Sequence, residues 1–349
     1  MLGGCDIAKP DLPSAIGPAV HLVGIYPKDG CGLGDSPDCT VPTNVTLAFR
    51  FDRFLNPATV NRQALRLYSG DPTLAPGPPP FEVVYDPIER VVEYHMPPGY
   101  ALEPATLYEL ELVVATSPDD SGIRAFDGAL LAEADVPLRG VFFTSNEQVA
   151  RPSDPAPSCA EIVGNSDAVF KTCVGSACHQ QGGNRVGALA VGDAPYGLWL
   201  DTPSHFSLSA VDRVARETET GDQSGGAPLE RGARFGVRMA LVDPRNPGGS
   251  YLMYKLLSNL ANYEACAAGD GAPICAEPAD PRKSAHALLP LAKGEDIRPP
   301  VEELDRLQEW FVKGAPMPRP RADQQPLSVH LQGLRAISRF IAAGADCRE

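Results

Sequence analysis

Charged residues are scarce in this sequence, and basic residues are the scarcer kind. Only 21% of the 349 residues are charged, with 30 Lys and Arg against 44 Asp and Glu, which gives a formal net charge of −14. Nothing in such a chain would neutralise a run of phosphates, so the composition argues against nucleic-acid binding. The same charge argues against electrostatic docking on anionic lipid.

Long apolar runs and hydrolase signatures are also missing. No apolar stretch approaches the ~20 residues that a membrane-spanning helix needs. The chain has no G-x-S-x-G motif, no H-E-x-x-H motif and no histidine in a convincing triad context, so the sequence gives no support for a hydrolase.

Proline, glycine and cysteine are plentiful instead. The 36 prolines and 33 glycines favour many turns and long ordered loops over one large helical bundle. A chain of 349 residues is long enough for two domains of ordinary size. The nine cysteines indicate an oxidising compartment, and their odd number leaves one that is free or modified.

The N-terminus supplies a candidate for the modified cysteine. Leu2-Gly3-Gly4-Cys5 resembles a bacterial lipobox, in which the cysteine carries the lipid and becomes the mature N-terminus. Residues 1–18 then form a lipoprotein N-terminus and a polar, proline-rich tether. Because the charged and apolar regions of a signal peptide are missing, we expect the true start to lie upstream. A chance LGGC in a flexible tail is the alternative.

Residues 19–146 contain seven short apolar runs separated by turn residues. In Val45 to Phe51 the large apolar side chains fall at every second position, as one buried face of a sheet requires. Runs of this length and spacing predict an antiparallel β-sandwich. The runs are HLVGIYP, VTLAFRFD, ALRLYSG, FEVVYDP, VVEYHMP, LYELELVVA and GVFFTS.

The order of signals in this region is similar to that of a known module. FRFDRFLNPATVN, LEPATLYELELV and VFFTS resemble the bacterial Ig-like module often named after an S-layer protein, although Pro104-Ala105 replaces its usual glycine turn. The resemblance implies a spacer or adhesion module without catalysis. Cys31 and Cys39 bracket a turn-rich loop, which predicts a local disulfide.

Residues 147–158 read as a polar, proline-rich linker, and the apolar period then changes from two to about 3.6. Ser250 is predicted to cap a helix that carries Leu252, Leu256 and Leu260 on one face. Two more helices are predicted over 301–314 and 327–343. Residues 159–349 are therefore expected to form a mainly α, loop-rich domain.

The stretch FKTCVGSACHQQGG holds Cys173, Cys178 and His179. Covalent attachment of haem needs two thiols for the vinyl groups and a histidine beside the second thiol for the iron. The spacing here is C-x4-C-H, a variant of the common C-x-x-C-H. A disulfide between the two cysteines remains a rival prediction, and a zinc site would need a further ligand such as His205 or His286.

The short sequence motifs that follow this stretch, and their order, resemble those of a family of cytochrome c-like domains in bacterial lipoproteins, over about 158–349. They include a P-x-x-S-Y-L-x-x-K-L helix, an M-P step and a final I-x-x-[WF]-I-x-x-G-A helix. The resemblance implies one haem c, with thioether bonds from Cys173 and Cys178, His179 as proximal ligand and Met317 as distal ligand. A thioether opposite an imidazole favours ferrous iron, which suits electron transfer.

The other cysteines have plausible partners. Cys266 and Cys275 flank a glycine-rich loop, and Cys159 and Cys347 stand at the two ends of the second domain. One lipid site, three disulfides and two thioethers account for all nine cysteines, as would four disulfides and the lipid site.

The sequence thus predicts a multidomain envelope lipoprotein, periplasmic or on the cell surface, with an Ig-like β-sandwich before a cytochrome c-like domain. It would touch the membrane only through its N-terminal lipid, exchange electrons with a redox partner protein and bind no nucleic acid. We expect an electron carrier rather than an enzyme. The alternative is a haem-free structural or interaction lipoprotein.

Overall fold

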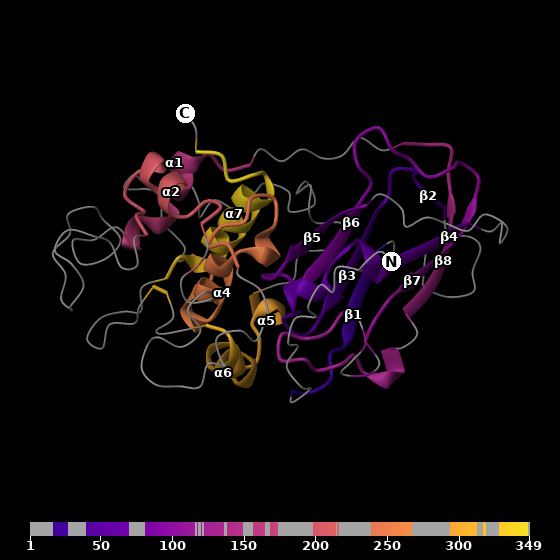
Figure 1. Cartoon of the computed structure of the whole chain (residues 1–349), viewed down its shortest axis with the longest axis horizontal. Helices are drawn as coiled ribbons and strands as arrows, with labels where there is room; N and C mark the ends of the chain where they lie inside the picture. Colours follow the sequence, from indigo (N-terminus) through magenta and orange to yellow (C-terminus); the bar gives the residue numbers. More distant parts are fainter. Residues whose placement is uncertain are drawn as a thin grey trace, which may run out of the picture.

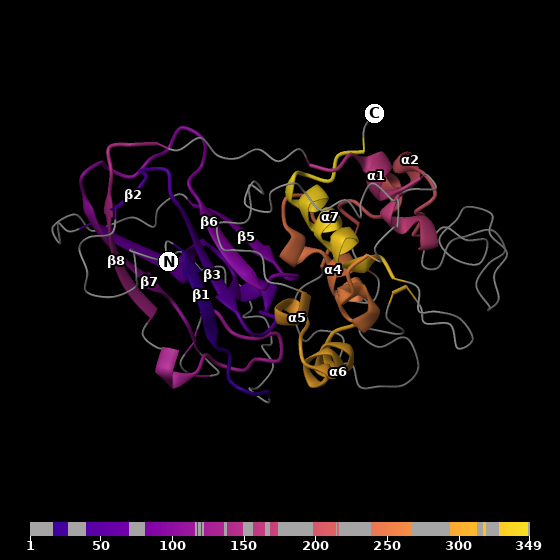
Figure 2. The same ribbon diagram turned by 180° about the vertical axis from the view of Figure 1, so that it is seen from behind.

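A pair of β-sheets stands beside a group of helices in the computed structural model (Figures 1 and 2). The structure describes residues 17–26, 40–69, 81–115, 117, 120, 122–135, 138–148, 156–164, 168–173, 198–213, 215, 239–266, 294–312, 317–318 and 328–347. The sheets come from the N-terminal part of the chain and the helices from the C-terminal part.

All seven predicted strands form, and together with an eighth strand, β2, they build two four-stranded sheets with the orders β1-β3-β6-β5 and β2-β8-β7-β4. Neighbouring strands are antiparallel except β2 and β8, which are parallel. The two residues of β2 are too few to show an alternating pattern, and the sequence analysis missed this strand. The strands are β1 (Leu22–Tyr26), β2 (Thr40–Val41), β3 (Thr46–Phe51), β4 (Leu65–Ser69), β5 (Glu82–Asp86), β6 (Val91–His95), β7 (Leu107–Leu112) and β8 (Leu138–Thr144).

The core of the β part lies between the two sheets, as the alternating pattern requires. Leu47, Phe49 and Phe51 on β3 are fully buried and belong to the same apolar cluster as Leu110 and Phe142 of the other sheet. Burying a large apolar side chain of this kind stabilises the fold by about 1.5–3 kcal/mol. The prediction of an antiparallel, β-rich N-terminal part is confirmed.

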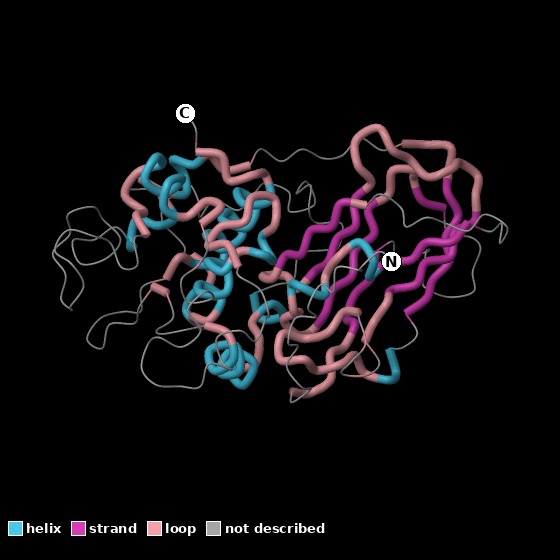
Figure 3. The backbone as a smooth tube through the Cα atoms, viewed as in Figure 1, coloured by secondary structure: helices cyan, strands magenta, loops and turns pink. Residues whose placement is uncertain are grey.

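The C-terminal part is built from short helices (Figure 3). Its longest described helix, α7, buries Leu331, Leu334, Ile337 and Ile341 along one stripe, as the sequence predicted. The elements are α1 (Cys159–Ile162), η4 (Val169–Cys173), α2 (Pro203–Ser209), η7 (Pro247–Gly249), α4 (Tyr251–Leu257), η8 (Leu260–Tyr263), α5 (Gly294–Ile297), α6 (Val301–Trp310) and α7 (His330–Ala342). A helical C-terminal part is therefore present, and its cytochrome c-like architecture stays a prediction.

The predicted helix after Ser250 differs in two respects from the structure. Ser250 does occupy the N-cap position of α4, but its side chain makes no capping hydrogen bond. Its hydroxyl instead donates to the Asn246 carbonyl oxygen and accepts from the Asp243 N–H. The helix ends at Leu257, so Leu260 falls in η8 with 40% of its surface exposed. Every residue of α4 is buried, because this helix lies inside the helical part.

The two parts share buried apolar surface. Phe54, Ile88 and Phe126 of the β part belong to the core cluster formed by the helices. Gly248 in η7 packs so closely on Tyr85 of β5 that an added Cβ would lie 2.4 Å from the tyrosine ring. Side-chain packing therefore continues across the boundary between the sheets and the helices.

Candidate functional site

Cys173, the first cysteine of the predicted haem motif, closes η4 inside the helical part. Its surface is 7% exposed, and it belongs to the helical core cluster. The η4 segment lies against α1 and α7. Gly333 of α7 permits this approach, because a Cβ there would lie 3.0 Å from a methyl group of Val169. The tertiary packing therefore holds the lead-in of the motif in one place.

The remaining residues of the motif, Cys178 and His179, lie outside the described part of the chain. The same is true of four other predicted cysteine sites, which are Cys5, Cys31, Cys39 and Cys275. The predictions for these six residues stay predictions.

Met317, the predicted distal ligand, packs partly buried against the same helical core as Cys173. Its backbone is fixed on both sides: its N–H donates to the Lys255 carbonyl oxygen at 3.2 Å, and its carbonyl oxygen accepts from Asn262 Nδ2 at 2.9 Å. Cys173 and Met317 are 144 positions apart in the sequence, and both contribute to one apolar cluster.

Aromatic side chains belong to the same cluster as Cys173. The rings of Phe170 and Phe206 lie 6.3 Å apart between centroids, and Phe206 lies 6.3 Å from Phe340 of α7. A porphyrin is a large, flat, apolar ring, and its iron takes imidazole and thioether ligands. The aromatic core, the buried Cys173 and the thioether of Met317, which packs against the same core, therefore fit a covalently held haem in their chemistry.

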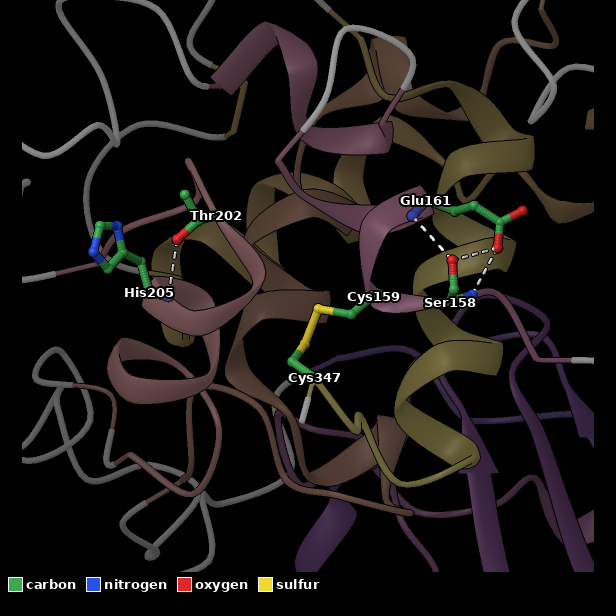
Figure 4. The surroundings of a disulfide bond; sticks show 6 residues. All are labelled: Ser158, Cys159, Glu161, Thr202, His205 and Cys347. Atoms are coloured by element: carbon green, nitrogen blue, oxygen red, sulfur yellow. Dashed lines mark hydrogen bonds between the residues drawn. A yellow bond between two sulfur atoms is a disulfide. The ribbon is translucent and has the colours of Figure 1, made fainter. Parts of the chain in front are cut away.

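A disulfide between Cys159 and Cys347 joins the two ends of the helical part (Figure 4), as the sequence predicted. The bond spans 188 residues and lies where α1 begins. The start of α1 is fixed by a capping box, in which the Ser158 hydroxyl accepts from the Glu161 N–H and the Glu161 carboxylate accepts from the Ser158 N–H. Cys266 is also disulfide-bonded. Oxidised cysteines agree with the oxidising compartment expected from composition.

His205, one of the possible zinc ligands, lies on α2 with a single carboxylate partner. Its Nδ1 is 2.8 Å from Asp201 Oδ1, and its ring lies 5.3 Å from that of Trp199. Figure 4 shows the His205 side chain directed away from the disulfide. Among the described residues, no group of three His, Cys, Asp or Glu side chains could hold a metal ion. His286 lies outside these residues.

The boundary between the two parts contains a buried ion cluster that the sequence did not predict. Arg53, at the end of β3, is 2.8 Å from Asp127 and 2.8 Å from Glu303 of α6. Glu303 also accepts the Phe54 N–H at 3.2 Å. No motif marks these residues, because their partners lie up to 250 positions away.

The pKa values in this cluster depend on one guanidinium, that of Arg53, which contacts the carboxylates of both Asp127 and Glu303. Burial raises the pKa of Glu303, and the contact with Arg53 only partly offsets the rise. Burial lowers the pKa of Arg53, but the hydrogen bond to Asp127 and the charge of Glu303 outweigh it, so this pKa is raised overall. The cluster therefore keeps Arg53 charged, whereas burial disfavours the ionised form of Glu303.

Further polar contacts cross the same boundary. Arg90 of the β part donates to the Ile297 carbonyl oxygen at the end of α5 at 2.8 Å. Arg335 of α7 donates to Glu89 through Nη2 at 2.6 Å and through Nε at 2.9 Å. A cleft of about 850 Å³ opens beside Arg53 and Arg90. These contacts fix the helical part against the sheets.

Comparisons with known proteins assign no family. No protein-family model matches the chain, and no curated protein matches it. Solved structures with partial similarity include an L,D-transpeptidase from Mycobacterium smegmatis, with 13% identity over 37% of this chain and 41% of that chain and a TM-score of 0.21. The S-layer protein rSbsC(31-844) has 9% identity over 41% of this chain and 17% of that chain, with a TM-score of 0.25. The chain thus spans less than half the length of these structures, and scores this low assign it neither a fold nor an activity.

Within the described part of the chain, no helix combines the length and the apolar character needed to cross a membrane.

Proposed function

We propose that this chain is a cell-envelope lipoprotein that carries one covalently bound c-type haem for electron transfer. The observation that carries this proposal is that Cys173 is buried in the apolar core of the helical part and that Met317 packs against the same core. The C-x4-C-H spacing and the order of steps after it give the same assignment from the sequence.

Four residues would hold the group. Cys173 and Cys178 would supply the two thioether bonds, and His179 and Met317 would supply the imidazole and the sulfur for the iron. When bound, a haem of this kind exchanges one electron between its ferrous and ferric forms. The protein would bury the ring among aromatic side chains, limit the access of water and hold the thioether in reach, and these effects favour the ferrous form.

The β part would act as an Ig-like spacer between the lipid surface and the haem domain. Lipid on Cys5 would anchor the chain, and the tether before Pro18 would lead to the first strand. The ion cluster of Arg53, Asp127 and Glu303 supports this role, because it joins the two parts through buried charged side chains. A redox protein of the cell envelope is the expected partner.

Haem staining of the purified protein on a denaturing gel tests this function. The protein has to be matured in a bacterial periplasm with a haem-attachment system. We expect a stained band for the wild type and none for a variant in which both Cys173 and Cys178 are replaced by alanine. A Ser209→Ala variant serves as control, because the change removes no cysteine and only the hydrogen bonds of the Ser209 hydroxyl to the Trp199 backbone, so it should keep the stain. An unstained wild type with both motif cysteines oxidised to each other would favour the haem-free alternative.

A further inference from the structure

We propose that Asn262, assisted by Asn259, is the positioning residue that presents Met317 to the iron. This inference rests on the proposed function, because it concerns the axial ligand of the same site. Both asparagines belong to the turn formed by η8 and the residue before it. Neither touches the iron, so they act through the backbone of Met317 and Pro318.

Asn262 lies at the junction of three segments and is completely buried. Its Nδ2 donates to the Leu256 carbonyl oxygen at 2.8 Å and to the Met317 carbonyl oxygen at 2.9 Å. Its Oδ1 accepts from the Val329 N–H at 3.0 Å and from the Ser328 hydroxyl at 3.3 Å. The amide group thereby uses both of its donors, and its oxygen accepts from the backbone; the Ser328 hydroxyl also lies 2.8 Å from the Ala261 carbonyl oxygen. One side chain ties the end of α4, the methionine and the start of α7 together.

Asn259 holds the next residue in the same way. Its Nδ2 donates to the Pro318 carbonyl oxygen at 2.9 Å, while its Oδ1 accepts from the Ala261 N–H at 3.1 Å. Only 6% of its surface is exposed. Together with the Met317 N–H bond to Lys255, three consecutive polar groups of the Met317–Pro318 backbone are fixed.

Fixing the backbone leaves the thioether side chain as the part of Met317 that can reach a ligand. A metal ligand contributes most when its surroundings hold it before binding, and outer-shell partners of this kind typically change metal affinity about 10- to 100-fold when they are removed. Buried carbonyl oxygens need hydrogen-bond donors, and here two buried amides supply them at two successive residues, Met317 and Pro318. These bonds therefore fix the backbone of Met317, as a residue that presents a ligand to the iron requires.

The test uses the full haem-bound chain and two readouts of the iron–sulfur bond. The first is the sulfur-to-iron charge-transfer band of the ferric protein, and the second is the dissociation constant for added imidazole, which competes with the methionine. For Asn262→Asp, which keeps the acceptor oxygen and loses both amide donors, we expect a weakened band and about tenfold tighter imidazole binding. Asn259→Ala removes the bond to the Pro318 carbonyl oxygen and the bond from the Ala261 N–H but leaves both backbone bonds of Met317 in place, so it should give a smaller change in the same direction.

Asn56→Ala is the matched control. Asn56 is also completely buried, but it caps a turn of the β part, so its loss destabilises the fold without touching Met317. The control should keep the band and the imidazole affinity of the wild type. Variants of Asn262 and Asn259 that retain haem, band and imidazole affinity overturn this inference alone. A wild type without covalent haem overturns the proposed function and, with it, this inference.

Discussion

Replacing Glu303 by alanine should lower the free energy of unfolding, because it removes a buried ion pair between the helical part and the sheets. Its carboxylate contacts Arg53 at 2.8 Å and accepts the Phe54 N–H, and only 4% of its side chain is exposed. Removing one partner of a buried ion pair costs about 3–5 kcal/mol. Arg53 keeps Asp127 at 2.8 Å, so we expect the lower end of this range, about 3 kcal/mol.

Chemical denaturation with two optical signals measures this effect. Both tryptophans, Trp199 and Trp310, lie in the helical part, so their fluorescence reports its unfolding, whereas circular dichroism also reports the sheets. We expect the two transitions to coincide in the wild type and to shift to lower denaturant in Glu303→Ala. Glu302→Ala is the control, because this neighbouring side chain is exposed and its loss should change stability by less than about 0.5 kcal/mol. A loss below about 1 kcal/mol for Glu303→Ala would refute the ion-cluster argument.

The pH dependence of the same site gives a second check. Burial raises the pKa of Glu303 above its value in the unfolded chain, so the folded state binds the proton more tightly. The contribution of this group to stability is therefore fully present below the unfolded pKa and is lost as the pH rises through the folded pKa. Glutamine resembles the protonated form at every pH. The stability of the wild type relative to Glu303→Gln should consequently be highest below the unfolded pKa, about 4.3, and fall as the pH rises toward neutral. An advantage that grows with pH would contradict this argument.

Two other changes test the packing of the helical part. Cys347→Ser opens the disulfide to Cys159 and should lower the free energy of unfolding by about 2–5 kcal/mol, so reductant should destabilise the wild type more than the variant, which keeps the disulfide of Cys266. Gly248→Ala places a Cβ 2.4 Å from the ring of Tyr85 and should cost about 1–3 kcal/mol, measured by thermal or denaturant unfolding. Equal stability of the glycine variant would mean that the boundary packs less tightly than the structure indicates.

Features with a local signal were predictable from the sequence. The apolar alternation in Val45 to Phe51 and the stripe of Leu331 to Ile341 gave the strand and the helix that the structure contains. Each pattern depends on which face of a single helix or strand is buried, so a short stretch of sequence is enough to reveal it. The pairing of Cys159 with Cys347 was predictable for another reason, because these two cysteines stand at the two ends of the predicted second domain.

Features that depend on distant residues were not predictable in this way. The partners Arg53, Asp127 and Glu303 are far apart in the chain and follow no motif. Asn262 was missed because an asparagine in a turn has many ordinary roles, and only the fold brings Met317 to it. Ser250 was assigned a capping role from its position alone, whereas the nearby loop offers its hydroxyl other partners.

Mass spectrometry of one peptide tests the central claim most directly. Trypsin cleavage after Lys171 and Arg185 releases residues 172–185, which contain Cys173, Cys178 and His179. For protein matured in a periplasm with a haem-attachment system, the account predicts that this peptide carries the mass of one haem through two thioether bonds. A peptide without that mass, and lighter by two hydrogens because its two cysteines form a disulfide, would contradict the account.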